Sequence, residues 1–345
     1  MTKLILSTGN IVSGGPSLLR KPGSFRSNLE LTKSLRNNFL AARQDYSAAA
    51  SPVRNGEPDG DVATSDANGG HQLNGQALPR IDDKNNLGSP RPHLDIWTDR
   101  SDDGQTLYVP RIDWSLAGLQ EDTADYDITV KLFFLPSAPV AERPRYIEEA
   151  LSLVRKELGV QHIDLLIASF PDMSFEGDCE WQADQRNASQ GDLEAEVATW
   201  AALEALHERG EVAALGISEF GTEKLSNFLR RVKIRPVVDQ INTRDCCNVP
   251  PPLIDLARAE GINLLVHTDC TDILPQGTLR ELLGQGPQGA GVLADPTVEN
   301  SNGEDNGALK GDLAPQWVVK YTAFIRDRGV LENKGYFAGA VLTQG

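Results

Sequence analysis

Ionisable and polar side chains end several apolar runs in the second half of the chain. They are Lys131 in VKLFF, Ser169 in IASFP, Ser218 and Glu219 in GISEF, Gln240 and Asn242 in DQIN, and His267 with Asp269 in LLVHTD. Lysine, histidine and carboxylate side chains act as proton donors and acceptors when they lie within hydrogen-bonding reach of one another. These residues are far apart in sequence, so any joint chemistry requires a fold that brings the ends of the runs together.

A metal site is one alternative for the last of these runs. His267 and Asp269, with Asp272 nearby, have side chains that can bind a metal ion, but a polar loop after a strand explains them more simply, and we favour the loop. Asp164 and Asp172 stand at opposite ends of one run, so they cannot work as a catalytic pair.

The elements that hold these residues alternate between strand and helix. The runs predict strands at 127–135, 163–170, 213–218, 236–242 and 262–267, and helices at 143–159, 192–210, 222–233 and 251–261. Gly159, Gly210, Gly261 and Gly329 each stand where a helix should end just before the next strand. This alternation is typical of parallel strands joined by helical crossovers, with both faces of the sheet covered.

Further elements are expected towards the two ends of the chain. They are a strand at 3–8, a helix at 27–46, a weaker strand near 106–112, a short helix at 278–284, a helix at 315–329 and a strand at 330–342. About eight strands favour a closed (β/α)8 TIM barrel of the α/β class over an open doubly wound sheet. No Gly-x-Gly-x-x-Gly turn follows the first strand, which argues against a dinucleotide fold of the doubly wound type.

One domain spanning 1–345 is expected, interrupted by three polar insertions. Residues 47–94 are rich in Gly, Asp, Asn, Ser and Pro and nearly free of aromatic residues. Such a segment buries too little apolar surface to offset its conformational entropy, so we expect a disordered insertion. Segments 172–191 and 285–312 also break the alternation and are expected to be surface loops.

Composition limits the classes of partner. The net charge is -16, whereas a nucleic-acid-binding face needs clustered Lys and Arg. The N-terminus lacks the basic start and long apolar stretch of a signal peptide, and no run approaches the roughly 18 apolar residues of a membrane span. Four cysteines without regular spacing indicate thiols in a reducing compartment. We therefore expect a cytoplasmic protein with neither a nucleic-acid nor a membrane partner.

Four of the apolar runs resemble the aldo-keto reductase superfamily. VKLFF is similar to the strand that ends in its catalytic lysine, HIDLLIASFP to the following strand, and ALGISEF and PVVDQIN to the next two. The resemblance implies a barrel of aldo-keto reductase type and places Lys131 at the lysine position. Ser169 stands where that family has its catalytic histidine, and a serine hydroxyl can neither carry positive charge nor replace the imidazole hydrogen bond to a substrate carbonyl.

The other parts of the reductase site have no match. The stretch from Asp122 to Tyr126 resembles the turn that carries the family's catalytic tyrosine, but Asp122 lies only nine residues before Lys131, which leaves no room for the intervening helix. The basic motif that binds the 2'-phosphate of NADPH is not recognisable in VLENKGYFAGAVL. We therefore expect no catalytic residue and no cofactor, with Lys131 as a vestige.

Longer segments resemble one branch of that superfamily, the regulatory (modifier) subunits of glutamate–cysteine ligase. They include LILSTGNIVSGGPSLLRKP, LGVQHIDLLIASFPD, VDQINTRDCCNVPPPLIDLARAEGINLLVHTD and QWVVKYTAFIRDRGVLENKGY. The resemblance implies a non-catalytic partner in glutathione biosynthesis, which forms a heterodimer with the catalytic subunit of the ligase. It further implies that this partner raises the affinity of the catalytic subunit for glutamate and relieves its feedback inhibition by glutathione. The functional part would then be an interface.

The vicinal pair Cys246 and Cys247 is the candidate for a partner contact or a redox role. Adjacent cysteines bond to each other only in a strained ring. Buried thiols are the simpler interpretation, and a disulfide to the partner is the alternative, favoured by the redox-sensitive association known in the resembling family. Two other functions stay open: a divergent NADPH-dependent aldo-keto reductase, and a scaffold for another partner that acts through the acidic insertions.

Overall fold

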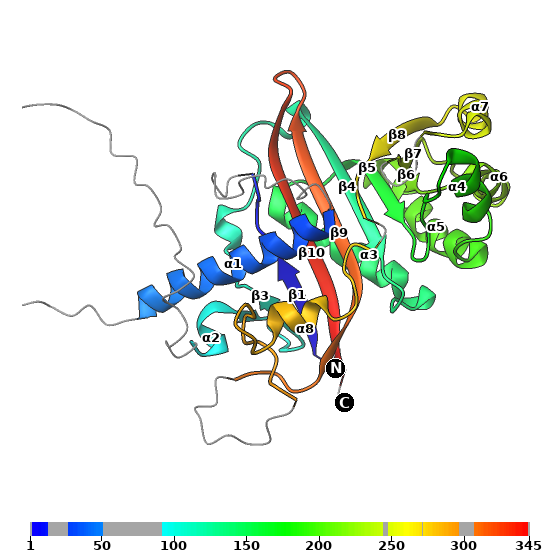
Figure 1. Cartoon of the computed structure of the whole chain (residues 1–345). Helices are drawn as coiled ribbons and strands as arrows, with labels where there is room; N and C mark the ends of the chain where they lie inside the picture. The colour runs from blue at the N-terminus through cyan, green and yellow to red at the C-terminus, as the bar shows by residue number, and fades with distance from the viewer. Residues whose placement is uncertain are drawn as a thin grey trace, which may run out of the picture.

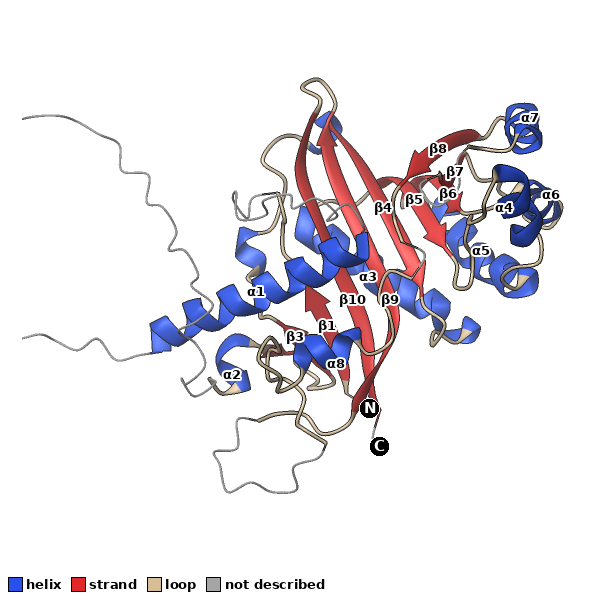
Figure 2. Ribbon diagram, in the orientation of Figure 1, coloured by secondary structure: helices blue, strands red, loops and turns tan. Residues whose placement is uncertain are grey.

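The computed structural model describes residues 2–12, 27–50, 92–243, 248–270, 272–296 and 307–343, with side chains for all of these except 47–50. One ten-stranded sheet runs through them, with helices on both faces (Figures 1 and 2). The strands are β1 Lys3–Ser7, β2 Asp99–Arg100, β3 Thr106–Val109, β4 Tyr126–Phe134, β5 Ile163–Ser169, β6 Val212–Ser218, β7 Val238–Asn242, β8 Asn263–His267, β9 Asp312–Ile325 and β10 Val330–Thr343. The α-helices are α1 Ser27–Ala50, α2 Leu94–Trp97, α3 Arg143–Leu158, α4 Glu180–Asn187, α5 Leu193–Glu208, α6 Thr222–Leu229, α7 Pro251–Glu260 and α8 Thr278–Leu283.

The sheet has two parts that differ in strand direction. Its order is β2-β3-β1-β10-β9-β4-β5-β6-β7-β8. Strands β4 to β8 are parallel to one another and follow the chain in order. The long antiparallel hairpin of β9 and β10 lies between β4 and β1, antiparallel to both. The C-terminal hairpin thus joins the N-terminal strand to the parallel half of the sheet.

Helix ends in the parallel half follow from local sequence. At the start of α5, the Asp192 carboxylate accepts hydrogen bonds from the backbone N–H groups of Glu194 and Ala195, which have no partner within the helix. Helices α3 and α7 end at Gly159 and Gly261, whose positive φ angles of 66° and 70° allow the chain to turn into the next strand. These caps fix where α5 begins and where α3 and α7 end.

Two hydrophobic cores lie on opposite faces of the sheet. The first is formed by α3, α5 and α6 with one face of β4 to β7 and β9, and it includes the fully buried Trp200 and Trp317. The second lies under α1, α2 and α8, against β1, β3 and β10, and includes Phe39 and Trp97. In Figure 1, α1 crosses the strands on the near side while α3 lies behind them. Burial of each large apolar side chain contributes about 1.5 to 3 kcal/mol.

Most elements of the parallel half were predicted to within a few residues, and the α/β class with its succession of parallel strands and crossover helices is confirmed. The described sheet has more strands than the eight expected. Its ten strands have a linear order, with β2 and β8 as the borders of the described part. The two additional strands are the short β2 and β9, whose residues were expected to form a helix.

The helix predicted at 315–329 is wrong. Those residues form most of β9 and the turn into β10. From Val319 to Ile325, buried side chains alternate with more exposed ones at period two. Trp317 and Val318 are both buried because the two faces of the sheet are covered here, and this continuous apolar stretch hides the alternation in the sequence.

Two of the three expected insertions carry more structure than was predicted. Segment 172–191 contains α4, where Ala183 and Asn187 are buried. In segment 285–312, the described residues include Ala290, Val292 and Leu293, which are buried in the second core, so this part is not only a surface loop. Of the proposed disordered insertion at 47–94, residues 51–91 lie outside the described part of the chain.

Candidate functional site

Lys131 lies on β4 with its side chain buried among groups from other strands. Its Nζ is 3.2 Å from Oδ2 of Asp269, in the segment after β8, and donates a 3.0 Å hydrogen bond to Oε1 of Gln240 on β7. Burial lowers the pKa of Lys131, and the negative charges of Asp269 and Glu219 oppose that decrease. The ammonium group therefore faces protein acceptors that already neutralise it.

Asp269 joins two lysines from different parts of the sheet. Besides its contact with Lys131, its Oδ1 accepts a 2.8 Å hydrogen bond from Nζ of Lys320 on β9. Burial acts to raise the pKa of Asp269, but the charges of Lys131, Lys320 and His267 hold this pKa well below its ordinary value. The carboxylate is thus ionised and ties the end of β8 to both β4 and the hairpin.

His267 and Glu219 form a second close contact beside this cluster. Nε2 of His267 lies 2.6 Å from Oε1 of Glu219, and the backbone N–H of Asp269 lies 3.0 Å from Nδ1 of His267. Glu219 has a left-handed backbone with φ of 65°, and its N–H donates to the carbonyl of Gln240.

Asp239 is a fully buried carboxyl group on β7. Its Oδ1 accepts a long 3.5 Å hydrogen bond from the backbone N–H of Phe220, and its Oδ2 is buried without a hydrogen-bond donor. Burial raises the pKa of Asp239 well above its ordinary value, with a further increase from the charge of Glu219. Burial therefore favours the neutral, protonated form of this carboxyl group over the ionised form.

The structure brings several of the predicted strand-end residues together. Lys131, Glu219, Gln240, His267 and Asp269 form one buried cluster, which we call the ionic cluster together with Lys320. Asn242 also reaches it, because its side-chain amide donates a 3.2 Å hydrogen bond to the carbonyl of Asp269.

Ser169 lies beside β4 but outside these contacts. It is buried at the end of β5 and pairs with Phe133 in the parallel ladder, two residues beyond Lys131. The groups that contact the Lys131 ammonium come from β7 and from the segment after β8. The position that would carry an imidazole thus holds a buried hydroxyl.

Tyr126 is buried at the first position of β4, and its OH donates a 2.7 Å hydrogen bond to Glu332. Burial and the neighbouring Glu332 raise the pKa of this phenol to about 12. Tyr126 and Lys131 are five residues apart on one strand, which corresponds to about 16 Å and to opposite faces of the sheet. Tyr126 is therefore not a proton donor for chemistry at Lys131.

Sequence reasoning missed two members of this region. Lys320 lies in the segment predicted as a helix, although the alternation in VVKYTAFI is a signal for a strand. Asp239 was overlooked inside PVVDQIN, where a single acidic residue in an otherwise buried strand was the available signal. Cys246 and Cys247 lie outside the described residues.

The described parts of the chain lack both a metal-binding cluster and a helix that could cross a membrane. No group of three or more His, Cys, Asp and Glu side chains there has an arrangement that could bind a metal ion. His267 and Asp269 instead contact Glu219 and the two lysines. Within the same residues, no helix has the length and apolar character needed to cross a membrane.

Comparison with known proteins adds a family and a set of relatives. The family model described as "Aldo/keto reductase family" matches residues 115–309, more than half of the chain. The chain is 27% identical over 245 residues to a putative glutamate–cysteine ligase regulatory subunit of Schizosaccharomyces pombe, an alignment that covers 66% of this chain and 75% of that protein. It is 24% identical over 220 residues to the glutamate–cysteine ligase regulatory subunit of Mus musculus, covering 64% of this chain and 68% of the mouse protein.

A solved structure with a weaker likeness is the Bombyx mori aldo-keto reductase in complex with NADP. It has 22% sequence identity and a TM-score of 0.30, and the match covers 40% of this chain and 39% of that chain. The chain thus spans less than half the length of this reductase.

Proposed function

Because the chain belongs to the aldo/keto reductase family, we propose that it is a non-catalytic member that regulates a glutamate–cysteine ligase. It binds the catalytic subunit of that ligase as a heterodimer, raises its affinity for glutamate and relieves its feedback inhibition by glutathione. Support for this choice of partner comes from relatives named as regulatory subunits, which align over about two thirds of the chain.

The enclosure of Lys131 is the observation that carries the non-catalytic part of the proposal. A group that transfers a proton must come within hydrogen-bonding reach of the substrate. The Lys131 ammonium instead faces Asp269 and Gln240, and the neighbouring strand offers the buried hydroxyl of Ser169. These residues do not fit the carbonyl chemistry that a nicotinamide cofactor would serve, and we assign Lys131 and the ionic cluster a structural role.

A regulatory subunit of this kind works through binding free energy. The catalytic subunit exists in a state that binds glutamate well and a state that binds it poorly. A partner that binds the first state more tightly shifts the equilibrium towards it, by the difference between the partner's binding free energies for the two states. A tenfold change in glutamate affinity requires a difference of about 1.4 kcal/mol. An interface of ordinary size can supply such a difference without any catalytic group.

We also propose that the protein acts in the cytoplasm. Its free thiols at Cys179 and Cys270 fit a reducing compartment. If Cys246 or Cys247 bonds to the partner, the complex should survive denaturing electrophoresis without reductant and separate when reductant is added. The variants Cys246→Ser and Cys247→Ser then identify which thiol is used.

The direct experiment is co-purification of the full chain with a tagged catalytic subunit of glutamate–cysteine ligase, followed by titration of the complex. The proposal predicts a dissociation constant in the micromolar range or below. A clean failure to bind at micromolar concentration of both chains would exclude the proposed partner.

A divergent NADPH-dependent reductase is the second candidate, and it is favoured by the family match and by the lysine retained at 131. Titration of the purified chain with NADPH, followed by nucleotide fluorescence, separates the two functions. The regulatory role predicts no saturable binding and no carbonyl reduction. Saturable binding together with reduction of a carbonyl substrate would establish the reductase instead.

A further inference from the structure

Strand β8 forms a border of the sheet with an unpaired outer edge. It pairs in parallel with β7 from Val238↔Asn263 to Asn242↔His267, and among the described residues no strand lies on its other side. Figure 1 shows β8 in the parallel half of the sheet, next to β7.

The backbone of this edge presents hydrogen-bonding groups. The N–H of Asn263 donates to the carbonyl of Val237, so residue 263 faces β7. Backbone groups of successive strand residues point to alternate sides of the strand. The N–H and C=O groups of Leu264 and Val266 therefore point away from β7, where a further strand would meet them.

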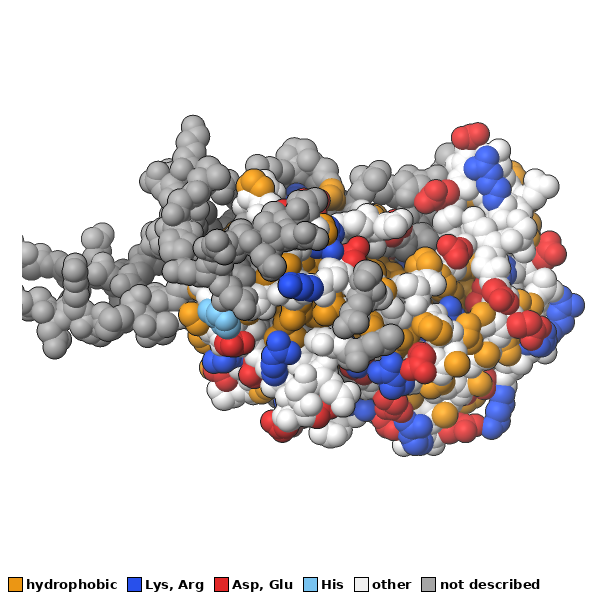
Figure 3. Space-filling view, turned by 90° about the horizontal axis from the view of Figure 1, so that it is seen from below, with side chains coloured by type: hydrophobic (Ala, Val, Ile, Leu, Met, Phe, Trp, Pro, Cys, Tyr) orange, Lys and Arg blue, Asp and Glu red, His pale blue; other side chains and the backbone are white. Residues whose placement is uncertain are grey.

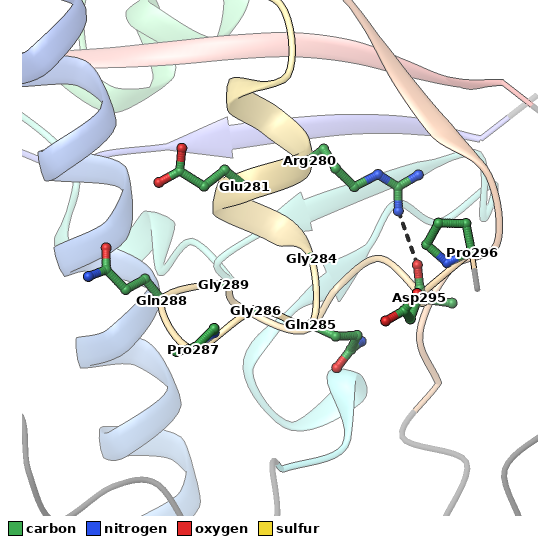
Figure 4. A pocket seen from close by; sticks show the side chains of 11 residues that line it. Arg280, Glu281, Gly284, Gln285, Gly286, Pro287, Gln288, Gly289, Asp295 and Pro296 are labelled. Atoms are coloured by element: carbon green, nitrogen blue, oxygen red, sulfur yellow. Dashed lines mark hydrogen bonds between the residues drawn. The ribbon is translucent and has the colours of Figure 1, made fainter. Parts of the chain in front are cut away.

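The side chains along the same edge are apolar and exposed. Leu265 is 42% exposed and Val266 is 67% exposed, and Val237 and Ile254 nearby are also exposed. On the face seen from below in Figure 3, hydrophobic side chains also lie exposed among charged ones on the right-hand part of the molecule. Soluble proteins usually protect a sheet border with Lys, Pro or a bulge, and NLLVH contains neither Lys nor Pro.

We propose that the outer edge of β8, residues 264–266, is the place where an extended segment of a partner protein adds as a further strand. Such a strand would satisfy the outward backbone groups and cover the exposed side chains. Leu265 shares a face of the sheet with Gln240, and Val266 shares the opposite face with Ile241. The incoming segment must therefore carry apolar side chains on both of its faces, as buried parallel strands do.

The ionic cluster holds this edge in place. Just beyond β8, Asp269 binds Lys131 on β4 and Lys320 on β9, and His267 at the end of β8 contacts Glu219. An edge that is already ordered loses less conformational freedom on binding. The residues that would form a catalytic site thus pre-order a docking strand.

A second copy of the chain is a less suitable occupant than a different protein. Each copy carries a net charge of -16, and this charge opposes self-association. The occupant we assign is a segment of the ligase catalytic subunit, and this assignment rests on the function proposed above.

The test compares dissociation constants for the purified catalytic subunit. Val266→Lys places a charge on the edge, and Val266→Pro removes an outward N–H while leaving the pairing with β7 intact. The matched control is Val330→Lys, at an equally apolar site that is 49% exposed at the turn between β9 and β10. We expect each Val266 variant to weaken binding by about tenfold or more, and the control to bind like the wild type, with unchanged melting temperatures.

The outcomes separate the two proposals. If the wild-type chain binds and the folded Val266 variants bind equally well, the β8 assignment is wrong and the regulatory function stands. If the wild-type chain does not bind the catalytic subunit, both are wrong. A wild-type dimer in sedimentation that Val266→Lys converts to a monomer would make a second copy the occupant and overturn the partner assignment.

Discussion

Replacing Asp239 with asparagine should stabilise the protein, and the gain should grow with pH. In the folded chain this carboxyl group is fully buried, accepts one long hydrogen bond from the N–H of Phe220 and leaves Oδ2 without a donor. Its pKa is raised well above the ordinary value of 3.8 by burial. Above pH 3.8 the unfolded chain therefore releases a proton that the folded chain keeps, so the wild-type protein loses stability as pH rises.

The size of the effect follows from this linkage. Asparagine has nearly the same shape and no ionisable proton, so Asp239→Asn should gain about 1.4 kcal/mol over the wild type for each pH unit above 3.8. The gain should stop growing at the pKa of the folded carboxyl. Urea unfolding of the full chain at pH 5, 6, 7 and 8 measures this gain in the free energy of unfolding. Asp102→Asn is the control at an exposed site, and it should change stability by less than about 0.5 kcal/mol. A variant that is equally stable or less stable than the wild type at every pH would refute the assignment of a buried, neutral Asp239.

Two further substitutions test other parts of the fold. Asp269→Asn removes the charge between Lys131 and Lys320 and should cost about 3 to 5 kcal/mol near neutral pH. Because the pKa of Asp269 is held below its ordinary value of 3.8, the stabilisation by this carboxylate should be lost as pH falls below that value. Urea unfolding measures the free energy of unfolding of both proteins. A loss of less than 1 kcal/mol near neutral pH would contradict a stabilising role of Asp269. Gly339→Ala should cost about 1 to 3 kcal/mol because the new methyl group overlaps the ring of Trp317, whereas Gly286→Ala enters open space and should leave the thermal midpoint unchanged.

The parallel half of the fold was predictable because its signals are local. Continuous apolar runs such as LLIAS mark strands with both faces covered, and Gly159 and Gly261 mark the helix ends through their positive φ angles. Each signal depends on a few neighbouring residues, so sequence reading found the elements to within a few positions.

The hairpin was not predictable in the same way. Trp317, Tyr321 and Phe324 have a spacing that suits one face of a helix, and the period-two burial of β9 depends on which strands lie beside it. That pairing joins residues about 190 positions apart in sequence. Tertiary context therefore overrode the local pattern.

Most residues of the candidate site could be predicted from the sequence, but their structural role in the ionic cluster could not. The strand ends supplied Lys131, Gln240, His267 and Asp269, since parallel strands bring their C-terminal ends to one edge. A second cation, Lys320, comes from the hairpin and binds the same carboxylate of Asp269 as Lys131 does. Its position depends on the strand pairing that the sequence did not reveal.

We propose that this chain acts through a partner rather than through a reaction of its own. The most direct measurement is the rate of a glutamate–cysteine ligase catalytic subunit as a function of glutamate concentration, with and without a saturating amount of the chain, repeated in the presence of glutathione. The proposed regulatory role predicts a lower apparent KM for glutamate and weaker inhibition by glutathione when the chain is present. Identical curves with and without the chain, measured with the chain in saturating excess over the catalytic subunit, would contradict the regulatory role.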